Sequence, residues 1–163
     1  MGFDQIIMML IWLSGITGFV VLTPKHLKRR LLLATFNFQA LVWLCSLILV
    51  SNGFISYPIR DFPNAIDVLL ATEYVLYPLL YGFHIIYKPK NLVTRRIYLL
   101  TSVSIITAID VILVYFTDLV LYVHYTWYWK WITIFVLFHL TNITFNWFMK
   151  EEVAFENEKR VSP

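Results

Sequence analysis

Apolar residues dominate five long stretches of the chain, and polar residues gather in short segments between them. Within a stretch, the apolar residues do not alternate with the polar positions that a surface helix or strand of a soluble protein shows. A helix that crosses a membrane needs about 20 mostly apolar residues. Five segments meet this requirement, at about 5–22, 31–52, 66–87, 97–120 and 128–149. The pattern therefore predicts an all-α polytopic membrane protein, a bundle of five transmembrane helices.

The segments between these spans are short and contain residues that end helices. Pro24 lies in TPKHLKRR, Asn52 and Gly53 lie in SNGF, and Pro89 lies in YKPKNL. The sequence shows no internal repeat and no low-complexity linker. We therefore expect residues 1–163 to form a single membrane domain that ends in a short tail at 150–163. The N-terminal MGFDQ has no Lys or Arg ahead of the first apolar stretch, so we expect a retained helix there and not a signal peptide.

Composition supports a membrane protein and argues against nucleic-acid binding. The chain is 60% hydrophobic, 18% aromatic and 14% charged, whereas soluble domains carry about 25% charged residues. The net charge of +3 is not spread along a groove, because the cations cluster between the apolar stretches. The single cysteine, Cys45, lies inside an apolar stretch and cannot form an intramolecular disulfide.

The distribution of Lys and Arg predicts the orientation in the membrane. The first and third loops and the tail together hold eleven of the 13 cations, and the second and fourth loops hold only Arg60 and Lys130. Cytoplasmic loops are enriched in Lys and Arg, so we expect the N-terminus outside and the C-terminus in the cytoplasm. The loop cations expected to contact anionic lipid headgroups are Lys25, Lys28, Arg29, Arg30, Lys88, Lys90, Arg95 and Arg96.

The segment HYTWYWKW at 124–131 follows from the same topology. It falls where the fourth span ends and the fifth begins, on the expected outer side. Trp and Tyr are enriched at membrane interfaces because their rings are apolar while their N–H and O–H groups prefer water. Base stacking would need a basic groove, which this side lacks. We interpret the segment as an outer aromatic belt, with the interfacial residues Tyr125, Trp127, Tyr128, Trp129 and Trp131.

Two acidic residues inside the predicted spans are the best indicators of function, because an ionisable group at the centre of a membrane helix costs about 2.5–3.5 kcal/mol. With a rise of about 1.5 Å per residue, Glu73 lies roughly 10 Å from the outer side. Asp110 lies roughly 20 Å from the inner side of a core about 30 Å thick. The two carboxyl groups are therefore predicted to share one level. His139, nearer the midplane, could pair with either, and Pro78 frees a backbone carbonyl close to Glu73.

Other polar residues are expected to support this site or to have only structural roles. Asp67, Asp118 and Lys130 lie near the outer interface, where water can reach them. Asn142 and Asn146 share one face of the fifth span with His139. Polar stripes of this kind often serve only to hold membrane helices together.

Two functions remain open on these observations. Neighbouring carboxyl groups in a membrane suit a site that binds or conducts a proton or small cation; the alternative is a non-catalytic structural or accessory subunit of a larger membrane complex. A homo-oligomer is expected if a wide path has to be enclosed. The sequence lacks catalytic and Cys/His metal-binding motifs, so an enzyme is unsupported, no catalytic residue or cofactor is assigned and the metal is unknown.

Several segments resemble one family. TPKHLKRR, EYVLYPLLYGFHIIYKPK, YFTDLVLY and WYWKWITIFVLF are together similar to small, uncharacterised multi-pass membrane proteins of spore-forming Gram-positive bacteria. The resemblance covers most of the chain and rests on aromatic and topological patterns. It implies a location in the bacterial plasma membrane and transfers no activity or site residue.

Overall fold

The structure is a bundle of helices joined by short loops. It is a computed structural model that describes residues 2–62 and 64–161, with side chains as far as Met149. The helices are α1 (Phe3–Val21), α2 (Lys28–Ser51), α3 (Tyr77–Ile86), α4 (Leu92–Phe116) and α5 (Trp127–Val161). A 3-10 turn, η1 (Lys25–Leu27), precedes α2, and a π-helical segment, η2 (Ala71–Leu76), leads directly into α3.

Four helices are long and apolar enough to cross a membrane, as expected of a multi-pass membrane protein. They are Phe3–Val21, Lys25–Ser51, Leu92–Phe116 and Trp127–Met149. Each of these helices carries several exposed large apolar side chains, which is the surface that a lipid-facing helix presents. The sequence therefore predicted these four helices, with boundaries that differ by a few residues.

The third predicted span is shorter than expected. Residues 66–69 are not helical, although the apolar pattern extended the span back to residue 66. Val68 and Leu69 are buried all the same. The side chain of Asp61 accepts a hydrogen bond from the backbone N–H of Ala71 at 3.2 Å, at the start of η2. A buried apolar loop and a buried helix have the same composition, so the pattern could not separate them.

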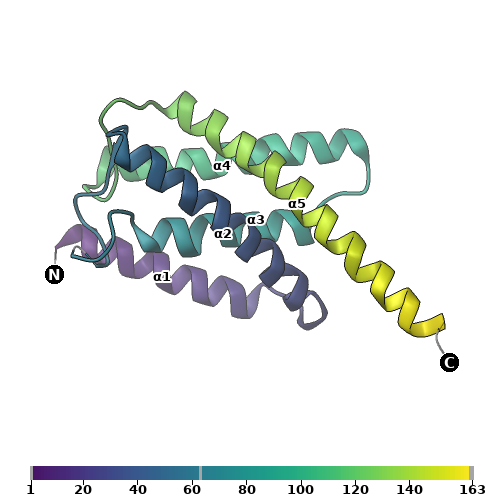
Figure 1. Cartoon of the computed structure of the whole chain (residues 1–163). Coiled ribbons are helices and arrows are strands. Elements are labelled where there is room, and N and C mark those ends of the chain that lie inside the picture. The colour runs from purple at the N-terminus through teal and green to yellow at the C-terminus, as the bar shows by residue number, and fades with distance from the viewer. Residues whose placement is uncertain (1, 63, 162–163) are drawn as a thin grey trace.

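The third helix occupies the centre of the bundle. The segment from η2 through α3 contacts α1, α2 and α4, and α5 packs across α2 and α4. Figure 1 shows α3 behind α2, with α5 crossing the bundle diagonally and ending beyond it. Close helix contact is visible at Gly82, where an added Cβ would lie 2.5 Å from Thr35 Oγ1 of α2. The η2–α3 segment, which carries Glu73 in η2, is therefore the least exposed helical segment among those described.

The helices alternate in direction, so the loops gather at two ends (Figure 1). We call the end with residues 22–30 and 87–96 the basic end; there the Tyr87 hydroxyl donates to the Leu22 carbonyl at 2.7 Å. We call the end with residues 52–70 and 117–131 the aromatic end. There β1 (Ile55–Ser56) pairs antiparallel with β2 (Leu121–Tyr122). The Asp118 amide donates to Asp4 Oδ1, which places the N-terminus at the aromatic end.

The turn after α2 reverses the chain so that β1 can pair with β2. Gly53 has a positive φ of 71°, a conformation that glycine adopts without steric cost. The amides of Gly53 and Phe54 donate to the carbonyls of Val50 and Leu49, which is the Schellman arrangement at a helix C-terminus. The chain then reverses into β1 and reaches Tyr57 above the bundle core.

Candidate functional site

Glu73 lies in η2 and is completely buried, with 0% of its surface exposed. Its carboxylate accepts hydrogen bonds from Ser46 Oγ of α2 and from the hydroxyl of Tyr57, which follows β1, each at 2.9 Å. Pro78 cannot donate a backbone hydrogen bond, and the preceding turns form the wider π-helix, in which the Tyr77 amide donates to the Thr72 carbonyl. π-Helical turns are frequent at functional sites.

Asp110 of α4 faces Glu73 from the other side of the core and is 1% exposed. Its two carboxylate oxygens accept hydrogen bonds from the hydroxyls of Tyr77 and Tyr122. Tyr77 lies on α3, one turn after Glu73, and Tyr122 lies in β2. Three separate elements thus build the environment of Asp110.

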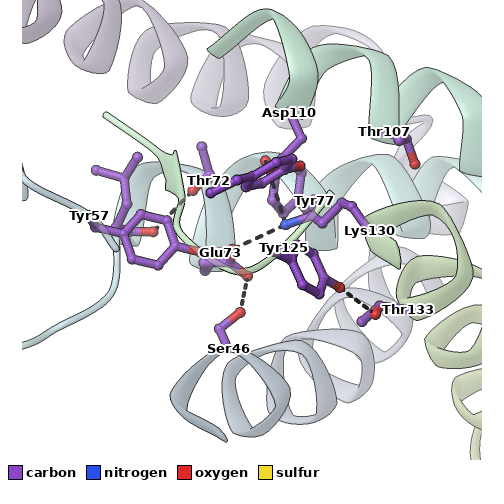
Figure 2. Close-up of polar contacts among 12 residues, drawn as sticks. Ser46, Tyr57, Thr72, Glu73, Tyr77, Thr107, Asp110, Tyr125, Lys130 and Thr133 are labelled. Atoms are coloured by element: carbon purple, nitrogen blue, oxygen red, sulfur yellow. Dashed lines mark hydrogen bonds and ion pairs between the residues drawn. The ribbon is translucent and has the colours of Figure 1, made fainter. Parts of the chain in front are cut away.

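Lys130 joins the two carboxylates. Its Nζ atom lies 3.0 Å from Asp110 Oδ1 and 3.9 Å from Glu73 Oε1, and it also lies 5.0 Å from the centre of the Tyr77 ring. Figure 2 shows the lysine side chain reaching between Glu73 and Asp110. The sequence interpretation placed Lys130 near the outer interface, within reach of water. That placement is corrected: Lys130 is only 3% exposed, because the first turn of α5 directs it into the core.

We name Glu73, Asp110 and Lys130, with the hydroxyls of Ser46, Tyr57, Tyr77 and Tyr122, the carboxylate–lysine cluster. It contains two carboxyl groups and one ammonium group, so its fully ionised form carries one surplus negative charge. Charges interact strongly in a low-dielectric interior, and the four donated hydroxyl hydrogen bonds partly compensate for the lost water. Burial raises the pKa of Tyr57 well above its usual range, and the charges of Glu73 and Asp110 raise it further.

Tyr122 is the member of the cluster nearest to the surface of the aromatic end. Burial raises its pKa, and the charge of Asp110 beside it adds to that effect. Both loop tyrosines therefore stay protonated and act as hydrogen-bond donors. Tyr122 remains half-buried, whereas the other members of the cluster are buried.

His139 does not belong to this cluster. The structure brings Glu73 and Asp110 together as the depth estimate predicted, but the third predicted member lies elsewhere. His139 is exposed, and its Nδ1 lies 3.2 Å from the Phe135 carbonyl of its own helix. It lines a cavity towards the basic end, together with Asn142 and Asn146. The polar stripe on α5 therefore faces away from the carboxylates.

The remaining supporting residues lie at the aromatic end. Asp67 is exposed and pairs with Arg60 at 2.5 Å. Asp118 is also exposed, at the end of α4. Neither residue contacts Glu73 or Asp110 in the described hydrogen bonds and ion pairs.

The aromatic segment before and within the first turns of α5 divides into two groups. Trp127, Tyr128 and Trp129 are exposed, as residues of an interfacial belt would be. Tyr125 and Trp131 are half-buried. The Tyr125 hydroxyl lies 2.6 Å from Thr133 Oγ1, and Trp131 Nε1 donates to Ser104 Oγ. These last two therefore also brace α5 against its surroundings.

Three tyrosines of the cluster were not predicted as site residues. Tyr77 could have been found, because it follows Glu73 by four positions and thus shares its helix face. Tyr57 and Tyr122 come from loops, and their approach depends on the pairing of β1 with β2. In the described part of the chain, no group of three or more His, Cys, Asp or Glu side chains could hold a metal ion.

Comparison of the chain with models of protein families, with curated proteins and with solved structures gave no match.

Proposed function

We propose that the chain is a five-span protein of the bacterial plasma membrane, with the N-terminus outside and the C-terminus in the cytoplasm. The positive-inside rule supports this orientation, because the loop cations collect at the basic end. The η2–α3 segment provides the additional span. Its 16 residues (Ala71–Ile86) reach about 24 Å, somewhat less than the hydrocarbon core of about 30 Å. The buried loop before Ala71 completes the crossing inside protein, where irregular backbone is tolerated.

Within this bundle, we propose that the carboxylate–lysine cluster binds a proton or small cation and passes it across the outer half of the membrane. The observation that carries the proposal is the shared ammonium group of Lys130, which lies 3.0 Å from Asp110 and 3.9 Å from Glu73. One surplus negative charge in a buried site is costly. A bound proton or monovalent cation removes that cost.

Glu73 is the carboxyl group that exchanges this charge. Lys130 lies closer to Asp110, so the ammonium stabilises the Asp110 anion more strongly. Glu73 keeps the longer ion pair and two hydroxyl donors. Addition of a proton to Glu73 leaves Asp110 and Lys130 as a neutral pair, and release of that proton restores the surplus charge.

Ion flux into proteoliposomes tests this function. Wild type is compared with Glu73→Gln and Asp110→Asn, and Asp67→Asn serves as the control because it removes an exposed carboxyl group at the same end. We expect proton or monovalent cation flux in wild type and the control, and loss of flux in Glu73→Gln. Absence of flux for every ion tested, in folded wild-type protein, would contradict the transport function.

The second candidate is a structural or accessory subunit of a larger membrane complex. Its support is that every carboxylate oxygen of Glu73 and Asp110 already has a hydroxyl or ammonium partner. Buried ion pairs can specify how helices pair without any transport role. A protein of this kind forms a defined hetero-complex in its native membrane, whereas a self-sufficient transporter purifies as a monodisperse monomer or homo-oligomer.

A further inference from the structure

A second polar cavity lies at the opposite end of the bundle, between α4 and α5. Its volume is about 510 Å³, within the range of about 300–1,000 Å³ that is usual for small-molecule sites. Three cations form its polar rim: Lys88 from the loop after α3, and Arg95 and Arg96 from the first two turns of α4. The carboxylate–lysine cluster plays no part in lining it.

The positive charge of this rim is not matched by acidic side chains. Lys88 Nζ donates to the neutral Asn142 Oδ1 at 3.3 Å. Among the side chains that the structure describes, no carboxylate pairs with Lys88, Arg95 or Arg96. Burial lowers the pKa of Lys88, and the positive charges of Arg95 and Arg30 lower it further. An anion bound between these cations would relieve their mutual repulsion.

The deeper part of the cavity is apolar. Leu99 and Leu100 of α4 and Phe135 of α5 form its walls. Leu99 follows the start of α4 by seven residues, or about 10 Å along the helix. Both helices are long and apolar enough to cross a membrane, so these walls lie at the depth of lipid chains and not of water.

The polar stripe on α5 connects the two parts. His139, Asn142 and Asn146 line the same cavity as Phe135. Asn142 Nδ2 donates to the Phe138 carbonyl, while its oxygen accepts from Lys88. The cavity thus has cations and amide groups together at its polar end, where Lys88 contacts Asn142, and hydrocarbon walls elsewhere. A membrane lipid likewise joins a polar phosphate and glycerol ester to an acyl chain.

We propose that this cavity binds one anionic phospholipid from the leaflet at the basic end. Arg95 and Arg96 bind the phosphate, because guanidinium groups bind phosphate oxygens in a bidentate manner, and Lys88 adds the charge of its ammonium group. The amide groups of the α5 stripe contact the glycerol region. One acyl chain lies along Leu99, Leu100 and Phe135. This site does not depend on proton or cation binding at the other end.

Native mass spectrometry of the purified protein tests the proposal. The probes are dioleoylphosphatidylglycerol and dioleoylphosphatidylcholine, which have the same acyl chains and differ in headgroup charge. We expect retention of the phosphatidylglycerol in preference to the phosphatidylcholine. The double variant Arg95→Gln/Arg96→Gln should weaken that retention by about tenfold or more, since each cation near an anionic lipid contributes about 1 kcal/mol.

The matched control is Lys25→Gln/Lys90→Gln, which removes the same charge from two exposed residues at the same end but outside the cavity. Retention should stay within twofold of wild type. Equal losses in the control and the cavity variant would overturn the proposal, because general attraction to anionic lipid would then explain both. Equal retention of the two lipids by wild type would also overturn it.

Two further arms test for an acyl chain in the cavity and separate the lipid from a soluble phosphate. Leu100→Trp fills the apolar wall without a change in charge and should reduce phosphatidylglycerol retention; unchanged retention contradicts an acyl chain in the cavity. If sn-glycerol 3-phosphate alone displaces the lipid at comparable concentration, the site recognises a soluble phosphate and the lipid assignment is wrong. Weak or absent displacement supports the lipid.

Discussion

Lys130 is the residue on which the carboxylate–lysine cluster depends. It supplies the cluster's only ammonium group, and its burial to 3% exposure means that water cannot replace it. Hydroxyl groups from Ser46, Tyr57, Tyr77 and Tyr122 supply hydrogen bonds but no formal charge. Loss of the ammonium group therefore leaves two carboxylates close together with nothing to balance them.

Lys130→Met should destabilise the folded protein by about 3–5 kcal/mol, the usual effect of removing one partner from a buried ion pair. Chemical unfolding in detergent, followed by tryptophan fluorescence, measures the change. The triple variant Lys130→Met/Glu73→Gln/Asp110→Asn should recover much of this loss, because no uncompensated charge remains. Lys90→Met, an exposed cation, should change stability by less than about 0.5 kcal/mol. Equal effects of Lys130→Met and Lys90→Met would show that the buried ammonium group is not needed.

At the scale of the elements, the central position of α3 depends on small residues at helix crossings. A Cβ at Gly82 would lie 2.5 Å from Thr35 Oγ1 and 3.4 Å from the Leu31 carbonyl, both on α2. At Gly18 of α1, an added Cβ would make ordinary contacts with Leu79 and Phe83, the nearest at 3.6 Å. The two glycines thus offer a strained and an unstrained position in the same bundle.

Gly82→Ala should lower stability by about 1–3 kcal/mol through overpacking, and it should be partly rescued by Thr35→Ala, which removes the clashing hydroxyl. Gly18→Ala should be neutral or slightly stabilising, because alanine is the better helix former. The measurement is again detergent unfolding of each variant. A neutral Gly82→Ala would mean that α2 and α3 are less closely packed than the structure shows.

The sequence predicted the elements better than it predicted their contacts. Long apolar stretches identified four helices, because a helix that crosses a membrane must consist almost entirely of apolar residues. The third prediction was too long, since Val68 and Leu69 are apolar but belong to a buried loop. The estimate of depth from the helical rise per residue predicted that Glu73 and Asp110 lie at one level. It could not identify Lys130 as their partner, because a lysine in the first turn of a membrane helix usually extends to water.

For the whole molecule, the main feature is the difference between its two ends, one rich in cations and the other rich in aromatic residues. The loop cations of the basic end and the exposed Trp127, Tyr128 and Trp129 of the aromatic end lie at opposite ends of the bundle. The proposed proton or cation site lies near the aromatic end, and the proposed lipid site lies at the basic end. The hydrogen bond from Tyr87 to Leu22 holds the first and third loops together at the basic end of the bundle.

This arrangement predicts the labelling of single cysteines by an impermeant thiol reagent. In a Cys45→Ser background, Lys25→Cys and Lys90→Cys should react only after the membrane is opened. Asn52→Cys and Val123→Cys, which replace exposed residues of the aromatic end, should react in intact cells. Labelling of positions 25 and 90 from opposite sides would contradict a crossing by η2 and α3.

The most direct test of the central claim is the protonation of Glu73 itself. Infrared spectroscopy distinguishes a protonated carboxyl group from a carboxylate by its C=O stretch. We predict that one protonated buried carboxyl signal appears and disappears as pH is changed in folded wild-type protein, that it is lost in Glu73→Gln, and that it persists in Asp67→Asn. No titrating buried carboxyl signal in wild type, or an unchanged signal in Glu73→Gln, would contradict proton exchange at Glu73.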